Sequence, residues 1–255
     1  MHWAARQQGP DSEGFRFFSW DQENIIDSLE REDPWVTDTM AMTDEEVENA
    51  SGALRRSPIW LNGKLRQNPT YARKFADRLH ALVFNDGPLT AEPSFERLMR
   101  RAREIDQAVV AQSARWGDVV RRNEPYKREV EWLAELDRLQ NEYFPQTLAY
   151  GLPRFVDVGL YPSVPAPRFN QHGGNASADF RLSMENPGDG GTIYYTLDGT
   201  DPRLPNDEVN ASAVPYRGNP LTLPADTVRV RARVLLEGTW SALNEADFTV
   251  MPGTV

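Results

Sequence analysis

Residues 227–236 read TVRVRARVLL, and their apolar and basic side chains alternate from Val228 to Val234. Successive side chains of an extended strand point to opposite faces, so a period of two predicts a β-strand with one buried and one solvent-facing side. This pattern is typical of an antiparallel sheet that covers a core with one face only. The buried face is expected to carry Val228, Val230, Ala232 and Val234, and the solvent-facing side Arg229, Arg231 and Arg233.

Further strand signals surround this segment. GTIYYTLDGTDP at 191–202 predicts a strand that ends in a turn at Asp198-Gly199. Short strands are expected near 180–184, 220–223 and 246–250. Residues 177–255 are therefore predicted to form an antiparallel, immunoglobulin-like β-sandwich.

Upstream, the hydrophobic period changes to that of helices. NPTYARKFADRLHALVF at 68–84 offers Asn68 as N-cap and Pro69 at the first helical position. Amphipathic patterns predict further helices at about 93–116 and 125–143. A fourth helical piece is expected to begin at Pro145, with interruptions at Gly151 and Pro153.

Residues 160–176 are rich in Pro, Gly, Ser and Asn and have no periodicity, which predicts a linker. The fold class is α+β with two domains: a mainly helical domain over 1–162, a linker over 163–176 and the β-sandwich over 177–255.

The composition excludes several classes of function. With 28 basic and 38 acidic residues the net charge is −10, which disfavours a nucleic-acid or anionic-membrane partner. The absence of cysteine rules out disulfides, thiolate zinc sites and cysteine nucleophiles. No apolar run approaches the roughly 18 residues of a membrane span, so none is expected.

Catalytic motifs of the serine-hydrolase, zinc-peptidase and phosphate-loop types are not found. The histidines, His2, His80 and His172, lie far apart in sequence, which favours structural or solvent-exposed roles. The acidic loop LDGTDPRLPNDE at 197–208 could supply oxygen ligands to calcium, but its spacing fits no EF-hand and turn chemistry explains it equally well.

Aromatic residues of the β-sandwich allow two interpretations. Tyr194 or Tyr195, Tyr216 and Trp240 could stack on sugars, or alternate aromatic side chains could fill the core. The core interpretation is favoured.

HWAAR and FRFFSW near the N-terminus are joined by a Gly/Pro/Asp-rich turn, which predicts a β-hairpin whose second strand leads to Asp21 and Glu23. In protein kinases a magnesium-binding aspartate follows the catalytic loop. Asp21 is thus a candidate metal ligand, with an exposed turn as the alternative.

The strings HWAAR and GFRFFSWDQE, together with the helix motif at 68–84, EIDQAVVAQSARWGD and GLYP, resemble the C-terminal part of CotH-type (spore coat protein H-like) atypical kinases over about residues 2–162. The resemblance implies a kinase C-lobe-like remnant. It assigns a metal-binding role to Asp21, and to Glu23 where the family often has a second Asp. Magnesium and ATP are implied for a complete domain.

The same resemblance places the nucleotide-binding lobe and the catalytic-loop aspartate before the hairpin, where this chain has almost no residues. Phosphoryl transfer needs phosphates, metal and acceptor positioned together. The isolated chain is therefore expected to be an inactive C-terminal portion without cofactor, from a secreted or surface parent protein.

GGTIYYTLDGTDPR at 190–203 resembles the chitobiase/β-hexosaminidase C-terminal type of β-sandwich, which implies an accessory module without catalytic residues. The alternative function is a non-catalytic module that binds a glycan or a neighbouring protein domain. A third is a protein associated with glycoside hydrolysis by two carboxylates, although no pair is identifiable.

Overall fold

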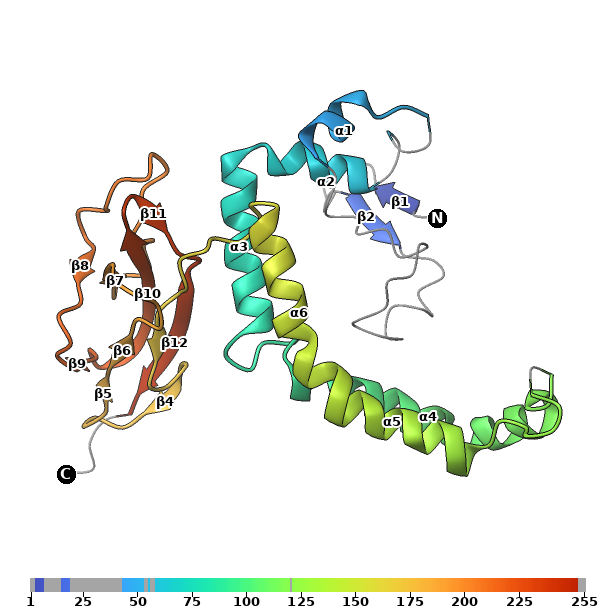
Figure 1. Cartoon of the computed structure of the whole chain (residues 1–255). Helices are drawn as coiled ribbons and strands as arrows, with labels where there is room; N and C mark the ends of the chain where they lie inside the picture. Colours follow the sequence, from blue (N-terminus) through green and yellow to red (C-terminus); the bar gives the residue numbers. More distant parts are fainter. Residues whose placement is uncertain are drawn as a thin grey trace. The chain divides into compact units, whose positions relative to one another are not determined.

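The computed structural model describes residues 3–6, 15–18, 43–52, 55, 58–119 and 121–251 (Figure 1). For 3–6, 15–18, 58 and 59 it describes only the backbone. Contacts divide the chain into two units. The first contains the described residues up to 65 and residues 89–154, and the second contains residues 66–88 and those from 155 onward.

The first unit begins with the predicted hairpin. Strands β1 (Trp3–Arg6) and β2 (Phe15–Phe18) pair antiparallel, with Trp3 opposite Phe18, which confirms that prediction. Helix α1 (Asp44–Asn49) starts with a capping box, in which Glu46 N–H donates to Thr43 Oγ1 at 3.2 Å and Thr43 N–H donates to Glu46 Oε2 at 2.8 Å. Helix α2 (Pro58–Arg66) follows.

Long helices form the rest of the first unit. Helix α4 (Ala91–Trp116) confirms the prediction at 93–116, and the chain returns through η2 (Arg128–Trp132), α5 (Leu133–Arg138), η3 (Leu139–Tyr143) and α6 (Phe144–Asp157). The last residues of α6, from 155 onward, belong to the second unit. The expected interruption at Gly151 and Pro153 is wrong, because α6 continues through both. A proline removes one backbone donor, and here the helix tolerates that loss.

The second unit contains helix α3 (Pro69–Val83), whose predicted cap is confirmed. Asn68 Oδ1 accepts hydrogen bonds from Thr70 N–H at 2.9 Å and Tyr71 N–H at 3.4 Å, and Pro69 occupies the first helical position. None of the helices within the described residues combines the length and apolar character needed to cross a bilayer.

The strands of the second unit form one large sheet and two small pairs. The large sheet has the order β4-β12-β10-β7-β8, and β11 pairs with β10. Its strands are β4 (Gly174–Ala176), β7 (Thr192–Thr196), β8 (Val214–Pro215), β10 (Asp226–Leu236), β11 (Thr239–Trp240) and β12 (Asn244–Val250). The small pairs join β3 (Arg168–Phe169) to β6 (Met184–Glu185) and β5 (Arg181–Leu182) to β9 (Leu221–Thr222).

The sheet is mixed, because β4 pairs with β12 in parallel. The predicted antiparallel pairing is found between the other strands of this sheet, and the parallel pair at this edge was not predicted. β4 and β3 both come from the segment predicted as a linker, 163–176, which also buries Val164 and Ala166. The predicted borders between the domains at 1–162, 163–176 and 177–255 stay a prediction.

The core of the second unit lies against the inner face of β10. All four residues predicted for that face are at most 3% exposed, and they pack with side chains of β5, β6, β7 and β12. The core members from these four strands are Leu182, Met184, Ile193, Ala246 and Phe248. The period of two therefore gave the buried face correctly, and the unit is β-sandwich-like.

The outer face of β10 departs from the prediction at one residue. Arg229 forms an ion pair with Asp247 across the strand pair and Arg231 with Glu245, and both arginines are at least a quarter exposed. Arg233, on the same face, is only 2% exposed. The prediction of a solvent-facing Arg233 is wrong because helix α3 and the loop after β7 cover it with two carboxylates.

Candidate functional site

Asp21 and Glu23, the predicted metal ligands, lie outside the described residues. Within the described part of the chain, no group of three or more His, Asp or Glu side chains is placed to hold a metal ion. The charged cluster around Arg233 is therefore the candidate site in the described residues.

Arg233 uses all five of its N–H donors in this cluster. Nε donates to Asp201 Oδ1 at 2.7 Å, and Nη2 donates to Asp201 Oδ2 at 2.6 Å. Nη1 and Nη2 donate to the two oxygens of Asp77, each at 2.7 Å, and Nη1 also donates to the Ser241 carbonyl at 2.9 Å. One guanidinium thus binds two carboxylates in the bidentate geometry that is strongest for this pair.

Each carboxylate also accepts a backbone hydrogen bond. Asp77 Oδ1 accepts from Leu243 N–H at 2.8 Å, and Asp201 Oδ1 accepts from Arg203 N–H at 3.0 Å. Burial alone would raise the pKa of Asp201, but the hydrogen bonds and charge of Arg233 outweigh it and hold that pKa below its ordinary value. The pKa of Arg233 is raised, because its carboxylate partners outweigh the effect of burial.

Local sequence chemistry places Asp201 beside Arg233. Strand β7 ends in a turn in which Gly199 has a φ of +75°, a conformation that glycine adopts without strain. Asp198 Oδ1 accepts from Thr200 N–H at 2.9 Å and closes this turn. The chain then leads directly into Asp201, so the acidic loop suspected of binding calcium serves turn formation and ion pairing.

A cleft of about 210 Å³ adjoins Arg233. Its walls come from α3, from residues 159–162 and from the sandwich, and all belong to the second unit. Besides Arg233 and Asp77 it is lined by two further arginines, Arg73 and Arg203. The Asp207 carboxylate lies 3.3 Å from each of them.

His80 lies on α3 and is 5% exposed. Its Nδ1 shares a hydrogen bond of 2.8 Å with the Tyr161 hydroxyl, and its ring stacks on Phe84 with centroids 4.5 Å apart. Nε2 is buried and has no hydrogen-bond partner in the described structure. Burial lowers the pKa of His80 to about 4, helped by the charges of His172 and Arg233 and opposed by Asp77. The predicted structural role of His80 agrees with this setting.

We expect the free energy of unfolding to fall as the pH drops from 6.5 to about 4, by about 3 kcal/mol from His80 alone. In this window the unfolded state binds a proton that the folded state excludes, so acid favours unfolding. Denaturant titrations at several pH values measure this effect as the difference in the free energy of unfolding between wild type and His80→Phe, because the variant lacks the titrating imidazole. Parallel stability curves for the two proteins would contradict the prediction, as would an NMR midpoint for His80 near 6.5.

Of the aromatic residues considered for sugar stacking, Trp240 is buried, and Tyr194, Tyr195 and Tyr216 are partly buried. Trp240 is 4% exposed, lies 5.8 Å from Tyr194 between ring centroids, and donates its indole N–H to the Asp207 carbonyl at 2.8 Å. Tyr195 and Tyr216 contact the core and each other, with centroids 6.3 Å apart. The structure therefore supports the core interpretation for these side chains.

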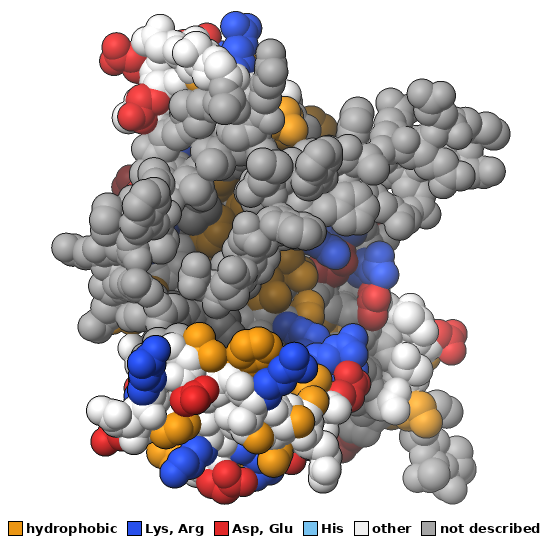
Figure 2. Space-filling view, turned by 90° about the vertical axis from the view of Figure 1, so that its right-hand side faces the viewer, with side chains coloured by type: hydrophobic (Ala, Val, Ile, Leu, Met, Phe, Trp, Pro, Cys, Tyr) orange, Lys and Arg blue, Asp and Glu red, His pale blue; other side chains and the backbone are white. Residues whose placement is uncertain are grey.

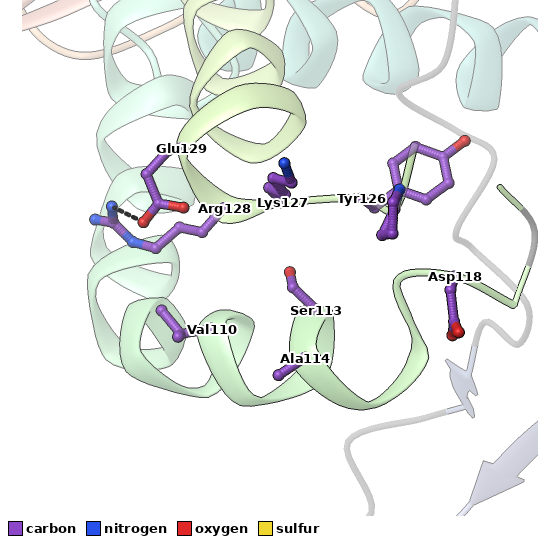
Figure 3. Close-up of a pocket in the computed structure, with 9 residues that line it drawn as sticks. Val110, Ser113, Ala114, Asp118, Tyr126, Lys127, Arg128 and Glu129 are labelled. Atoms are coloured by element: carbon purple, nitrogen blue, oxygen red, sulfur yellow. Dashed lines mark ion pairs between the residues drawn. The ribbon is translucent and has the colours of Figure 1, made fainter. Parts of the chain in front are cut away.

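A second cavity, of about 390 Å³, lies in the first unit. Figure 3 shows Val110, Ser113 and Ala114 on α4 facing the segment that carries Tyr126 to Glu129. One of the charged groups here is paired within the protein: Arg128 donates to both oxygens of Asp106 at 2.8 Å and lies 3.7 Å from Glu129.

The end of the α4–α5 pair also exposes apolar side chains. In Figure 2, hydrophobic groups lie among basic and acidic ones on the lower part of the molecule. The exposed apolar residues of this region are Val110, Trp116, Val119, Tyr126, Val130 and Leu133. Nothing in the structure shows what covers them.

Comparison with known proteins gives one match. No significant match was found among curated proteins or among solved structures. The resemblances of residues 2–162 to CotH-type proteins and of residues 190–203 to the chitobiase type stay predictions. Residues 180–241, which include Asp201 and Arg233, match the family model described as Fn3 associated, so the C-terminal part of the chain is similar to fibronectin-associated β-sandwich domains.

Proposed function

We propose that this chain is a non-catalytic interaction module, the C-terminal portion of a CotH-like protein, in which the sandwich and helix α3 form one preassembled unit. The observation that carries this proposal is the saturation of Arg233 by Asp77 and Asp201. The carboxylates of Asp77 and Asp201, which a catalytic function would need, are both bound to Arg233 and hold α3 on the sheet.

The protonation behaviour of the site supports binding over catalysis. A general acid or base works best with a pKa near the operating pH. The pKa of Asp201 is held below its ordinary value, and that of His80 is lowered to about 4 in a buried position. A glycosidase needs one carboxylic acid whose pKa is raised, whereas Asp201 shows the opposite shift.

The partner that fits this module best is a neighbouring protein domain. Sugar recognition commonly uses exposed aromatic rings, but Trp240 is buried and Tyr195 packs against the core. The CotH resemblance assigns a metal-binding role to Asp21 and Glu23. They would bind magnesium with ATP only together with residues of a complete domain. The parent protein is proposed to be secreted or surface-bound.

Calorimetric titration of the full chain with magnesium, and then with magnesium and ATP, tests the non-catalytic part of this proposal. We expect no saturable heat and no phosphate release. The matched variant is Asp21→Asn, which should give the same trace as wild type. A saturable ATP signal that disappears in Asp21→Asn would overturn the proposal and favour a functional nucleotide site.

A further inference from the structure

The guanidinium of Arg203 differs from that of Arg233 in having few partners. Its side chain is 11% exposed, and its Nε lies 3.3 Å from Asp207 Oδ1. Within the described part of the chain, the Arg203 side chain makes no hydrogen bond. Arginine has five N–H donors. Within the described residues, no Arg203 nitrogen is among the fully buried side-chain atoms that lack a partner, and Arg203 lines the cleft, so its donors are accessible to a ligand there.

A second arginine approaches the same carboxylate oxygen. Arg73 Nη1 donates to Asp207 Oδ1 at 3.3 Å, while its Nη2 donates to Thr70 Oγ1 at 3.2 Å. Both contacts to Asp207 are longer than the 2.6–2.7 Å bonds between Arg233 and its carboxylates. The Asp207 side chain is also 55% exposed. A long contact to a solvated carboxylate is weak, so another anion can replace it.

The charges of the cleft balance only when Asp207 is counted. Arg233 with its two aspartates carries a net −1, Arg73 and Arg203 add +2, and Asp207 brings the total to zero. When the Asp207 side chain turns to solvent, the cleft has a net charge of +1. One bound anion would then neutralise the cleft.

The electrostatic setting of Arg203 agrees with this balance. Its pKa is lowered first by burial and then by the positive charges of Arg233 and Arg73, which Asp207 and Asp77 offset only in part. An additional anion beside Arg203 would compensate this repulsion.

The remaining walls of the cleft are apolar. They are formed by Ala72, Ala76, Leu160, Pro162 and the rings of Tyr161 and Trp240. The volume of about 210 Å³ lies below the roughly 300–1,000 Å³ of drug-sized ligand sites, so only a small body fits.

We propose that this cleft binds a small carboxylate with a short apolar or aromatic body, and that the ligand carboxylate takes the place of the Asp207 side chain between Arg73 and Arg203. Asp207 is then a built-in competitor for the site. This binding role does not depend on the CotH resemblance.

The backbone of Asp207 is held independently of its carboxylate. Its N–H donates to the Leu204 carbonyl at 3.0 Å, and its carbonyl accepts from Trp240 Nε1 at 2.8 Å. Its φ is +68°, in the left-handed region that Asp and Asn tolerate best among non-glycine residues. The side chain can therefore leave the arginines while the loop keeps its conformation.

Titration of the full chain with benzoate, followed by NMR of the arginine Nε–H and Trp240 indole signals, tests the proposal. Benzamide, which has the same ring but no charge, is the control ligand. We expect saturable shifts with benzoate only. Asp207→Asn keeps the shape and the left-handed backbone while removing the competing charge, and it should bind benzoate about tenfold more tightly.

Arg73→Gln should weaken benzoate binding about tenfold or more, because it removes one of the two cations. Arg229→Gln makes the same change of charge on the outer face of β10, away from the cleft, and should leave the affinity unchanged. No saturable shift in Asp207→Asn, equal affinity in wild type and Arg73→Gln, or equal response to benzamide would each overturn the proposal. The Mg-ATP titration probes Asp21, so the two proposals can fail separately.

Discussion

Replacement of Arg233 by methionine is expected to lower the free energy of unfolding of the second unit by about 3 kcal/mol. Methionine fills much of the same volume but leaves Asp77 and Asp201 facing each other without a cation. Loss of one partner from a buried ion pair costs about 3–5 kcal/mol, and the lower end applies because the two carboxylates are 26% and 34% exposed. Hydrogen exchange of amides in β10 during native-state denaturant titration measures this loss.

Arg229→Met is the matched control, on the same strand and the same face. Arg229 forms a bidentate pair with Asp247, but the two side chains are 48% and 52% exposed, so its loss should destabilise the unit clearly less than the loss of Arg233. Equal losses in the two variants would show that burial adds nothing to the Arg233 cluster.

Lowering the pH should reduce the difference in the free energy of unfolding between wild type and Arg233→Met. In wild type the folded-state pKa of Asp201 is depressed, so its stabilisation is present near neutral pH and is lost as the pH falls through that pKa. In the variant, protonation relieves two unpaired carboxylates and so favours the folded state. If the difference in the free energy of unfolding stayed constant from pH 7 to about pH 4, this electrostatic cause would be contradicted.

Asp77→Asn is the second change with a large expected effect. Asp77 is the carboxylate that α3 contributes, and it accepts two bonds from Arg233 and one from Leu243 N–H. The amide has the same shape but brings an NH₂ group against a guanidinium. We expect a loss of about 2 kcal/mol and a selective loss of exchange protection in α3.

Asp247→Asn is the control for this substitution, because Asp247 accepts an equally bidentate pair of bonds from Arg229 at 2.7 and 2.8 Å. It should cost less than about 1 kcal/mol and leave the protection of α3 unchanged, since both partners are half exposed. Unchanged protection of residues 69–83 in Asp77→Asn would mean that apolar contacts alone hold the helix.

The sequence predicted those features that local chemistry determines. Asn68 and Pro69 marked the start of α3, and the alternation in β10 identified its core-facing side. The fate of Arg233 could not be predicted in this way. Alternation tells which side chains share a face, but not what covers that face, and Asp77 lies 156 residues earlier in the chain.

The candidate site was predicted less well than the fold. In the sequence, Asp201 is one acid of a turn-forming loop, and Asp77 is one polar residue of an amphipathic helix. The available signal was Arg233 itself. It lies near the end of β10, on which the other two outward arginines have acidic cross-strand partners, whereas Arg233 is opposite Tyr194 of β7. An arginine without a cross-strand acid must find its carboxylate elsewhere if it is to be buried.

Native-state hydrogen exchange of the wild-type chain tests most directly whether α3 and the sandwich form one unit. We expect the slowest amides of α3 (Pro69–Val83) and of β10 (Asp226–Leu236) to open with the same free energy and the same denaturant dependence. A helix α3 that opens at several kcal/mol less than β10, with a smaller denaturant dependence, would contradict it.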